Sequence, residues 1–399
     1  VELVFMAFVA RYHGGVLHVS LPNPESSGTL NQPTFHNQQR SVPCFLPVLA
    51  LAFGLLWSAS ALTQPPGQPD NGLVILQYHH IDDDTPPSTS TSPAIFQDHL
   101  NYLVANEYKV VSLPSAISTL RSGLDLPPRS VAITFDDAYD SIYNTALPML
   151  VAHEMPFTVF VATDYMNRPH YMSTAQMREM LSQRVSFANH TRSHVHLQRK
   201  LDGEDDAAWE RRIVDEIEGA EQILGEALGE QHKLLAYPYG EYNLRVLSIV
   251  DKLGYTAFGQ QSGPASHRAD FALLPRFPMG GPYSSMKQFP TKVASLPMPL
   301  TGTQRIEPLA EETRPELNIT LSGDNLRLHQ LACYGPGGAV EMTQEGSHFI
   351  IRGIEPIPSG RSRYNCTMPA RVARGNRQTY HWYSQLWLRK RSDGSWHPD

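Results

Sequence analysis

The sequence predicts a closed or nearly closed parallel (β/α) barrel, followed by a small all-β, sandwich-like domain. Between residues 72 and 282, short apolar strands alternate with helices about seven times, a pattern typical of a parallel sheet. That number of repeats favours a barrel over an open doubly wound sheet, which stays the structural alternative. After Pro282 the alternation ends, and short β-type segments dominate from Leu317 onward.

Each element follows from a short apolar run or from a helical period of apolar residues. The expected barrel strands are Leu73–Tyr78, Tyr108–Leu113, Val131–Phe135, Phe157–Ala162, Val185–Ala188, Leu234–Tyr237 and Tyr255–Phe258. The expected helices between them are Ile95–Glu107, Ala116–Arg121, Tyr139–His153, Thr174–Gln183, Ala207–Leu228 and Leu244–Leu253. In the β domain, the expected strands are Asn318–Leu321, Gln330–Tyr334, His348–Arg352 and Tyr380–Leu388.

The first part of the chain has the pattern of an exported protein. Residues 40–61 are interpreted as a signal peptide, because Arg40 precedes an apolar run and Ala61 ends an Ala-x-Ala sequence. A membrane anchor is the alternative, but the run is shorter than the ~20 residues usual for a span. Residues 1–39 precede this signal and are interpreted as an upstream extension from a start codon assigned too early. Residues 62–71 are expected to be a flexible leader, 283–312 a linker, and 313–399 the β domain.

The net charge bears on the class of partner, and the cysteine content bears on disulfide formation. The formal net charge of -7 argues against a nucleic-acid partner, which usually requires a basic face. After signal removal, Cys333 and Cys366 are the remaining cysteines. In an oxidising compartment such an isolated pair is expected to form a disulfide. The alternative, a metal pair, lacks the two further ligands of a structural zinc site.

Two motifs at expected strand ends indicate metal-assisted hydrolysis. Asp136 and Asp137 follow one strand, and His190 and His194 follow another. In a parallel barrel, catalytic groups gather where strands end, so one carboxylate can bind metal while the other remains a base. Histidines four apart lie on one side of a helical turn, a geometry that holds one cation. Taken alone, Asp-Asp is also a common turn or helix cap, and the histidines could be ordinary surface or core residues.

Three further candidates are less specific. Tyr239 lies in the turn Tyr237–Gly240, whose backbone N–H groups could form an oxyanion hole. His79 ends the first strand, where a histidine could protonate a leaving amine. Arg276 could orient the base by charge pairing, or could be a surface arginine. No Gly-x-Ser-x-Gly sequence occurs, so a serine hydrolase is unsupported.

Over residues 72–282, these motifs resemble the polysaccharide deacetylase family (the NodB homology domain, carbohydrate esterase family 4). Its TFDD motif is similar to Thr134–Asp137, and its His-[Ser/Thr]-x-x-His motif to His190–His194. The resemblance implies a (β/α)7-like distorted barrel, with Asp136 as catalytic base and Asp137, His190 and His194 as metal ligands. The Tyr-Pro-Tyr-Gly turn is most similar to the poly-N-acetylglucosamine deacetylase branch, in which Tyr239 would offer its backbone N–H to the oxyanion.

The chain departs from the family pattern at two places. Ala236 stands where many members have Arg, and no late Leu-x-His motif follows Arg276 within the domain. A Leu-x-His string occurs at Leu326–His329, but it lies in the β domain. A circularly permuted arrangement, with Leu76–His79 in that role, would supply the missing general acid.

The expected function is therefore removal of N-acetyl groups from an N-acetylglucosamine-containing polysaccharide, with water activated by a divalent metal and an Asp base. Zinc is the expected ion, and cobalt, nickel or iron also suit two histidines and a carboxylate. The alternatives are a non-catalytic glycan-binding envelope protein and a polysaccharide O-acetyl esterase that uses the same site. The expected location is periplasmic or secreted, at a bacterial cell envelope, with no membrane span after signal cleavage. The expected partner is the acetylated polysaccharide, and the expected state is a monomer.

Overall fold

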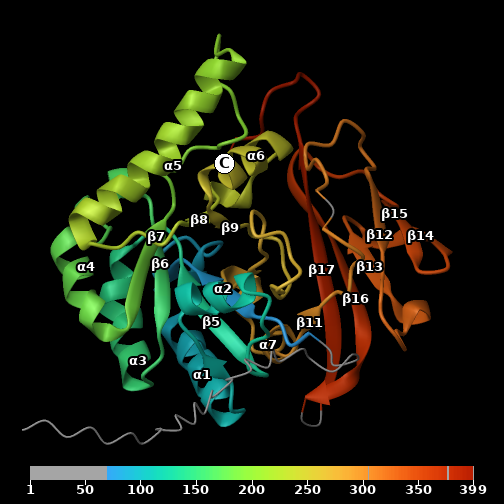
Figure 1. The fold of residues 1–399 in the computed structure, drawn as a ribbon, viewed down its shortest axis with the longest axis horizontal. Coiled ribbons are helices and arrows are strands. Elements are labelled where there is room, and N and C mark those ends of the chain that lie inside the picture. Colours follow the sequence, from blue (N-terminus) through green and yellow to red (C-terminus); the bar gives the residue numbers. More distant parts are fainter. Residues whose placement is uncertain (1–69, 304, 375–376, 399) are drawn as a thin grey trace, which may run out of the picture. The chain divides into compact units, whose positions relative to one another are not determined.

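The computed structural model describes residues 70–303, 305–374 and 377–398, which fall in one compact unit. The predicted upstream extension, the signal peptide and most of the leader lie outside these residues. Figure 1 shows a curled parallel sheet with helices packed on it, and a second sheet built by the C-terminal part of the chain. The predicted fold class, a (β/α)7-like barrel followed by a small β domain, is confirmed.

The barrel sheet contains eight strands, with the order β10-β1-β5-β6-β7-β8-β9 and with β4 paired to β5. All of its pairings are parallel. The strands are β1 (Val74–Tyr78), β4 (Lys109–Val110), β5 (Ser130–Phe135), β6 (Phe157–Val161), β7 (Val185–Asn189), β8 (Leu234–Ala236), β9 (Thr256–Phe258) and β10 (Phe277–Pro278). A separate two-stranded ladder joins β2 (His80–Ile81) to β3 (Ser90–Thr91).

One segment brings the two edges of this sheet together. Leu274 forms a parallel bridge with Phe258 of β9, and three residues later Phe277 pairs with Leu76 of β1. The segment between them carries Arg276, whose backbone N–H donates to the carbonyl of Gln261. The sheet therefore curls into a distorted barrel, with Arg276 on the closing segment.

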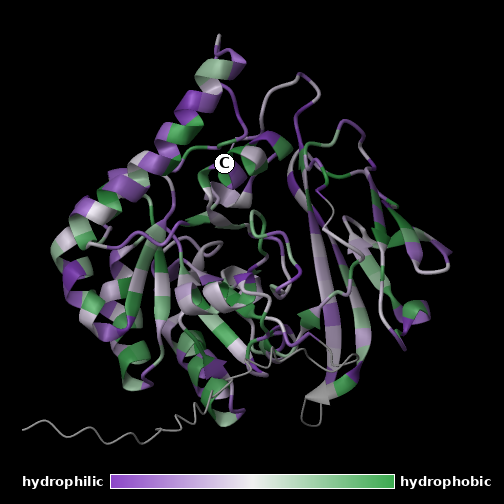
Figure 2. Cartoon of the chain, viewed as in Figure 1, coloured by the Kyte–Doolittle hydropathy of each residue, from purple (hydrophilic) through white to green (hydrophobic). Residues whose placement is uncertain are grey.

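The helices cover the barrel through their apolar faces. In α5, buried residues recur at helical spacing from Trp209 to Leu228, and Figure 2 shows hydrophobic and hydrophilic residues alternating along it. Asp205 caps its start by accepting from the Ala208 N–H, and Gly229 ends it in the left-handed conformation. The helices are α1 (Pro93–Ala105), α2 (Leu113–Arg121), α3 (Leu147–Ala152), α4 (Thr174–Met180), α5 (Asp206–Leu228), α6 (Leu244–Leu253) and α7 (Phe289–Val293).

Two barrel elements differ from the sequence expectation. The helix expected from Tyr139 starts instead with a π-helical turn, η1 (Ile142–Ala146), and continues as α3. Its expected first residue, Tyr139, is instead in an antiparallel bridge with Tyr171, so helical backbone begins after it. The strand expected from Tyr108 to Leu113 contains only Lys109–Val110, since Leu113 already begins α2, with a proline in its first turn.

The second sheet has seven strands, in the order β11-β17-β16-β13-β14-β15-β12. They are β11 (Leu296–Pro297), β12 (Glu316–Thr320), β13 (Ala332–Gly335), β14 (Gly338–Glu345), β15 (His348–Gly353), β16 (Gly360–Arg374) and β17 (Arg377–Arg389). Cys333 and Cys366 face each other in the β13–β16 ladder and form a disulfide, as the sequence predicts. Side chains from β12, β13, β15, β16 and β17 share one core around this bond.

Residues 283–312, which the sequence predicts to be a linker, contain two packed elements. Phe289 of α7 stacks on the ring of His99 in α1 at 4.0 Å, and β11 adds a parallel edge strand to β17. The second sheet also packs against barrel helices, since Leu386 and Leu388 of β17 lie in one apolar cluster with residues of α5 and α6. Among the described residues, no helix combines the length and apolar character needed to cross a membrane.

Candidate metal centre

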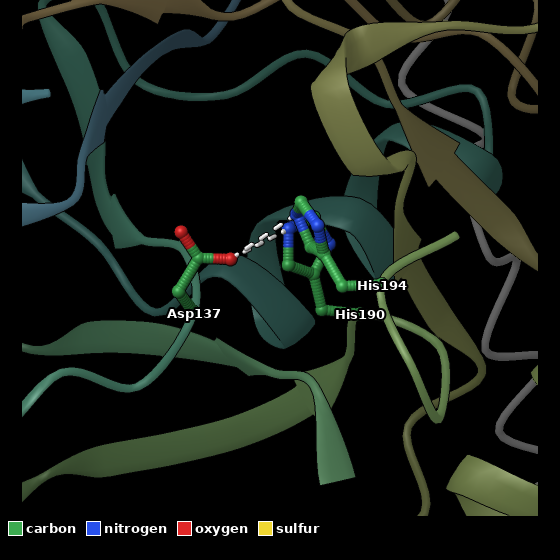
Figure 3. A group of neighbouring side chains, drawn as sticks. All are labelled: Asp137, His190 and His194. Carbon is green, nitrogen blue, oxygen red and sulfur yellow. Dashed lines mark ion pairs between the residues drawn. The ribbon is translucent and has the colours of Figure 1, made fainter. Parts of the chain in front are cut away.

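The predicted motifs meet at the carboxyl ends of the barrel strands. Asp136 and Asp137 follow β5, and His190 and His194 lie on the loop after β7. Asp137 Oδ1 lies 3.3 Å from Nε2 of His190 and 3.3 Å from Nε2 of His194 (Figure 3). The ligand atoms of the three residues all lie within 4.8 Å of one another. We call this group, Asp137, His190 and His194, the metal triad.

The orientation of the side chains in the metal triad suits a cation. His190 Nδ1 lies 2.8 Å from the Ala236 carbonyl, to which it donates, so Nε2 is the ring nitrogen that faces Asp137. Burial opposes protonation of this ring, but the hydrogen bond to Asp137 and the charges of Asp136 and Asp137 raise its pKa. Burial, with a smaller effect from the charge of His190, lowers the pKa of His194 to about 4, so its ring is neutral at pH 7. Burial alone would raise the pKa of Asp137, but the hydrogen bond and charge of His190 and the charge of His194 bring it below its usual value. One carboxylate and two imidazole nitrogens form the donor set of an open zinc-type site.

The triad is carried on left-handed backbone. The φ values are 72° at Asp137, 67° at Thr191 and 57° at His194, and such positions cost about 1–3 kcal/mol each. The segment from His190 to His194 is therefore not the helical turn that the sequence suggests, although both rings still converge. Strain of this kind persists only where the surroundings hold the backbone in place.

Hydrogen bonds from the end of β7, from within the loop and from α5 hold the histidine loop, residues 190–194. Asn189 Oδ1 accepts from the Thr191 N–H at 2.8 Å, and Thr191 Oγ1 accepts from the His194 N–H at 3.1 Å. Glu216 of α5 accepts from the backbone N–H groups of Arg192 and Ser193 and from the Ser193 hydroxyl. Sequence reasoning missed Glu216, because nothing in a helical sequence shows which loop a charged side chain will contact.

Asp136 is held by two fully buried partners. Arg276 Nη1 lies 2.7 Å from Oδ1 of Asp136 and Nη2 lies 2.8 Å from Oδ2, a bidentate pair with no solvent exposure on either side chain. The surface alternative for Arg276 is therefore wrong. Gln77 of β1 adds a third hydrogen bond, with Nε2 2.6 Å from Oδ2. Burial opposes ionisation of Asp136, but Arg276 outweighs it and lowers the pKa of the carboxyl group.

The turn after β8 presents Tyr239 beside His194. Tyr239 is left-handed at φ 59°, and its ring meets that of His194 edge-on at 4.6 Å. The same ring stacks on His196 at 3.9 Å, and His196 Nδ1 lies 2.6 Å from Oε2 of the buried Glu241. Arg361 of β16 reaches this turn from the second sheet, 3.3 Å from Glu241 and 5.4 Å from the centre of the Tyr239 ring.

His79 follows β1 at the same edge and stays partly exposed. Its positive charge contributes to lowering the pKa of Asp136 and of Asp137, so it lies within electrostatic range of both carboxylates. A cavity of about 660 Å³ lies elsewhere, lined by the loop after β9 and by β16 and β17. It contains none of the predicted site residues.

The polysaccharide deacetylase family model matches residues 123–258, which include Asp136, Asp137, His190, His194 and Tyr239. A putative polysaccharide deacetylase, YxkH, from Bacillus subtilis is 27% identical over 183 residues, 46% of this chain and 62% of the relative. The poly-β-1,6-N-acetyl-D-glucosamine N-deacetylase of Escherichia coli is 24% identical over 266 residues, 57% of this chain and 39% of the relative. This chain thus spans less than two thirds of the length of these relatives.

Among solved structures, IcaB from Ammonifex degensii is similar to this chain with a TM-score of 0.49 and 25% identity, over 58% of this chain and 98% of IcaB. The deacetylase PplD from Streptococcus pyogenes has a TM-score of 0.48 and 25% identity, over 53% of this chain and 93% of PplD. By the family match, residues 123–258 of this chain are similar to polysaccharide deacetylases, and the sequence relatives agree with that likeness.

Proposed function

We propose that this chain is a metal-dependent hydrolase that removes N-acetyl groups from an N-acetylglucosamine-containing polysaccharide. The observation that carries the proposal is the position of a buried carboxylate, Asp136, one residue from the metal triad. A site that only binds glycan has no need of a carboxylate held ionised in a buried position beside three metal ligands. Relatives that are poly-β-1,6-N-acetyl-D-glucosamine N-deacetylases support the substrate class.

The metal triad fits a divalent ion, and zinc suits its ligands best, with cobalt, nickel or iron as alternatives. Bound there, such an ion would lower the pKa of water and polarise the acetamide carbonyl. The position of the metal is supported by the orientation of His190, whose Nδ1 bonds to the Ala236 carbonyl and whose Nε2 faces Asp137.

The chain's own groups then have distinct roles. Asp136 accepts the proton of the attacking water, while Arg276 and Gln77 fix the position of its carboxylate. The backbone N–H of Tyr239 donates to the oxyanion that develops on the carbonyl. His79, which follows β1, donates a proton to the departing amine of the sugar.

The compartment is part of the proposal. We infer export to the periplasm or the cell exterior, where the Cys333–Cys366 disulfide would be stable. The predicted signal peptide at residues 40–61 agrees with this location.

The test is acetate release from a β-1,6-linked N-acetylglucosamine oligomer by protein that has been stripped of metal and reloaded with Zn²⁺, Co²⁺, Ni²⁺ or Fe²⁺. Asp136→Asn and chelator should each abolish release, while Asp202→Asn, a change at an exposed carboxylate, should not. Release that survives both Asp136→Asn and chelator would overturn the mechanism. Release from an O-acetylated glycan alone would favour the esterase, and glycan binding without turnover under every metal would favour the non-catalytic alternative.

A further inference from the structure

A row of three tyrosines leads away from the metal triad along the barrel rim. Tyr139 follows the two aspartates, and its ring lies 5.0 Å from that of Tyr171. The ring of Tyr171 in turn lies 5.0 Å from that of Tyr165, in the short helix η2 (Thr163–Tyr165) after β6. The interplanar angles are 30° and 41°, so successive rings are only moderately tilted. We call Tyr139, Tyr171 and Tyr165 the tyrosine row.

The backbone around the tyrosine row is well tied together. Tyr139 and Tyr171 form an antiparallel bridge, and hydrogen bonds join the two loops on both sides of it. Asp140 N–H donates to the His170 carbonyl at 3.0 Å, and Met172 N–H donates to the Ala138 carbonyl at 2.9 Å. The loop after β6 is also joined to the histidine loop, since Thr163 N–H donates to the Thr191 carbonyl. The row is therefore fixed relative to the metal triad.

Partial exposure distinguishes the row from tyrosines that are fully inside the core, and Tyr139 also packs against the barrel core. Tyr78 and Tyr237, which do pack in the core, are 1% and 0% exposed. All three members of the row keep part of their surface in solvent. At the outer end, the exposed Arg168 places its guanidinium 4.8 Å from the centre of the Tyr165 ring.

The inner end of the row lies beside the metal site, because Tyr139 follows the ligand Asp137 by two residues. Besides its contact with Tyr171, the Tyr139 ring stacks on His80, with ring centres 3.6 Å apart. A ligand held at the metal triad would therefore meet the tyrosine row as it leaves the site in this direction.

We propose that the tyrosine row is a sugar-binding subsite, which stacks the pyranose next to the one whose acetyl group is removed. A pyranose presents apolar C–H faces and a rim of hydroxyl groups, and a tyrosine offers a matching apolar ring and polar edge. This inference rests on the proposed function, because the glycan is its ligand. The three rings are joined by two ring contacts, so the row can stack one or two neighbouring sugars. It does not contact a single sugar bound at the metal triad.

The experiment compares a β-1,6-linked N-acetylglucosamine pentamer with the monosaccharide. Tyr165→Ala and Tyr171→Ala should lower kcat/KM for the pentamer by about tenfold, mainly through KM, and should affect the monosaccharide much less. Tyr171→Phe keeps the ring and should retain most of the pentamer activity. Tyr334→Ala, a change at a tyrosine that is 53% exposed on the second sheet, is the matched control and should behave as the unmodified protein.

Pentamer binding to the Asp136→Asn protein, measured by calorimetry, gives a readout without turnover. Tyr165→Ala in that background should weaken binding by a similar factor, with metal content and circular dichroism unchanged. If both alanine variants lose nothing, or lose the same factor on pentamer and monosaccharide, the row is ordinary packing and the inference fails. If no metal supports acetate release, the proposed function fails, but pentamer binding that is lost in Tyr165→Ala would still support the subsite.

Discussion

Replacing Arg276 by methionine should damage both stability and the proposed chemistry. The change removes the cation paired with Asp136 and leaves a carboxylate with no solvent exposure and no ion-pair partner. It also removes two hydrogen bonds to that carboxylate, of 2.7 and 2.8 Å. Methionine fills much of the same volume, so the loss of charge is the main perturbation.

The size of the stability loss follows from the burial of Asp136 and from the hydrogen bond to Gln77 that remains. Removing one partner of a buried ion pair typically costs 3–5 kcal/mol. Gln77 still donates to Oδ2 at 2.6 Å, so we expect a loss near the lower limit, about 3 kcal/mol. Without the Arg276 charge the pKa of Asp136 should rise, because Arg276 is the group that most strongly offsets the effect of burial. The acid limb of the kcat/KM profile should therefore move to higher pH.

Urea unfolding and a pH–rate profile measure these two effects. Arg352→Met is the control, because Arg352 and Glu316 form an exposed pair at 3.2 Å whose loss should cost less than about 1 kcal/mol. The double variant Asp136→Asn/Arg276→Met has no unpaired buried charge, so it should recover much of the stability while remaining inactive. If Arg276→Met is as stable as Arg352→Met, or the double variant is no more stable than Arg276→Met alone, the account of this pair is refuted.

Three further predictions concern stability and metal affinity. Burial lowers the pKa of His99 to about 4 from 6.5, and its neutral ring bridges Tyr78 and the Ser284 carbonyl. The contribution of neutral His99 to stability is complete above pH 6.5 and is lost as the pH falls toward 4. The free energy of unfolding should therefore drop by about 3 kcal/mol over that range. His99→Asn should flatten the plot of unfolding free energy against pH. Glu216→Gln should loosen the histidine loop and weaken zinc affinity about 10- to 100-fold in a chelator competition. Unchanged affinity would show that the Glu216 hydrogen bonds do not position the ligands. Cys333→Ser should cost about 3–4 kcal/mol in urea unfolding, from the 33-residue loop that the disulfide closes, and a reductant should then have no further effect.

The site could be predicted from sequence wherever its parts lie at strand ends. Asp137, His190 and His194 follow apolar runs that are expected to be parallel strands of one sheet, so their meeting at one edge follows from the topology. The pairing of Arg276 with Asp136 could be proposed but not settled, because it depends on how the segment from Leu274 to Pro278 closes the barrel. Gln77 went unnoticed, although a glutamine inside the apolar strand Val74–Tyr78 was a visible signal.

The β domain was harder to predict in detail. β14 is exposed along nearly its whole length and lacks an apolar period, so no pattern marks it as a strand. Its pairing with β15 is a backbone property that side-chain periodicity does not report. For the same reason, the segment predicted as a linker gave no sign of β11, a two-residue strand whose partner lies at the end of the chain.

The second sheet is not independent of the candidate site. Arg361 of β16 pairs with Glu241, and Glu241 also accepts from His196, the residue on which the Tyr239 ring stacks. A left-handed tyrosine is a strained conformation that its surroundings must hold, and here part of those surroundings comes from outside the barrel. The family match ends at residue 258, so it includes Tyr239 and Glu241 but not Arg361. The support of this turn is therefore a feature of the whole chain, because the barrel motif supplies the turn and the β domain supplies one of the contacts that hold it.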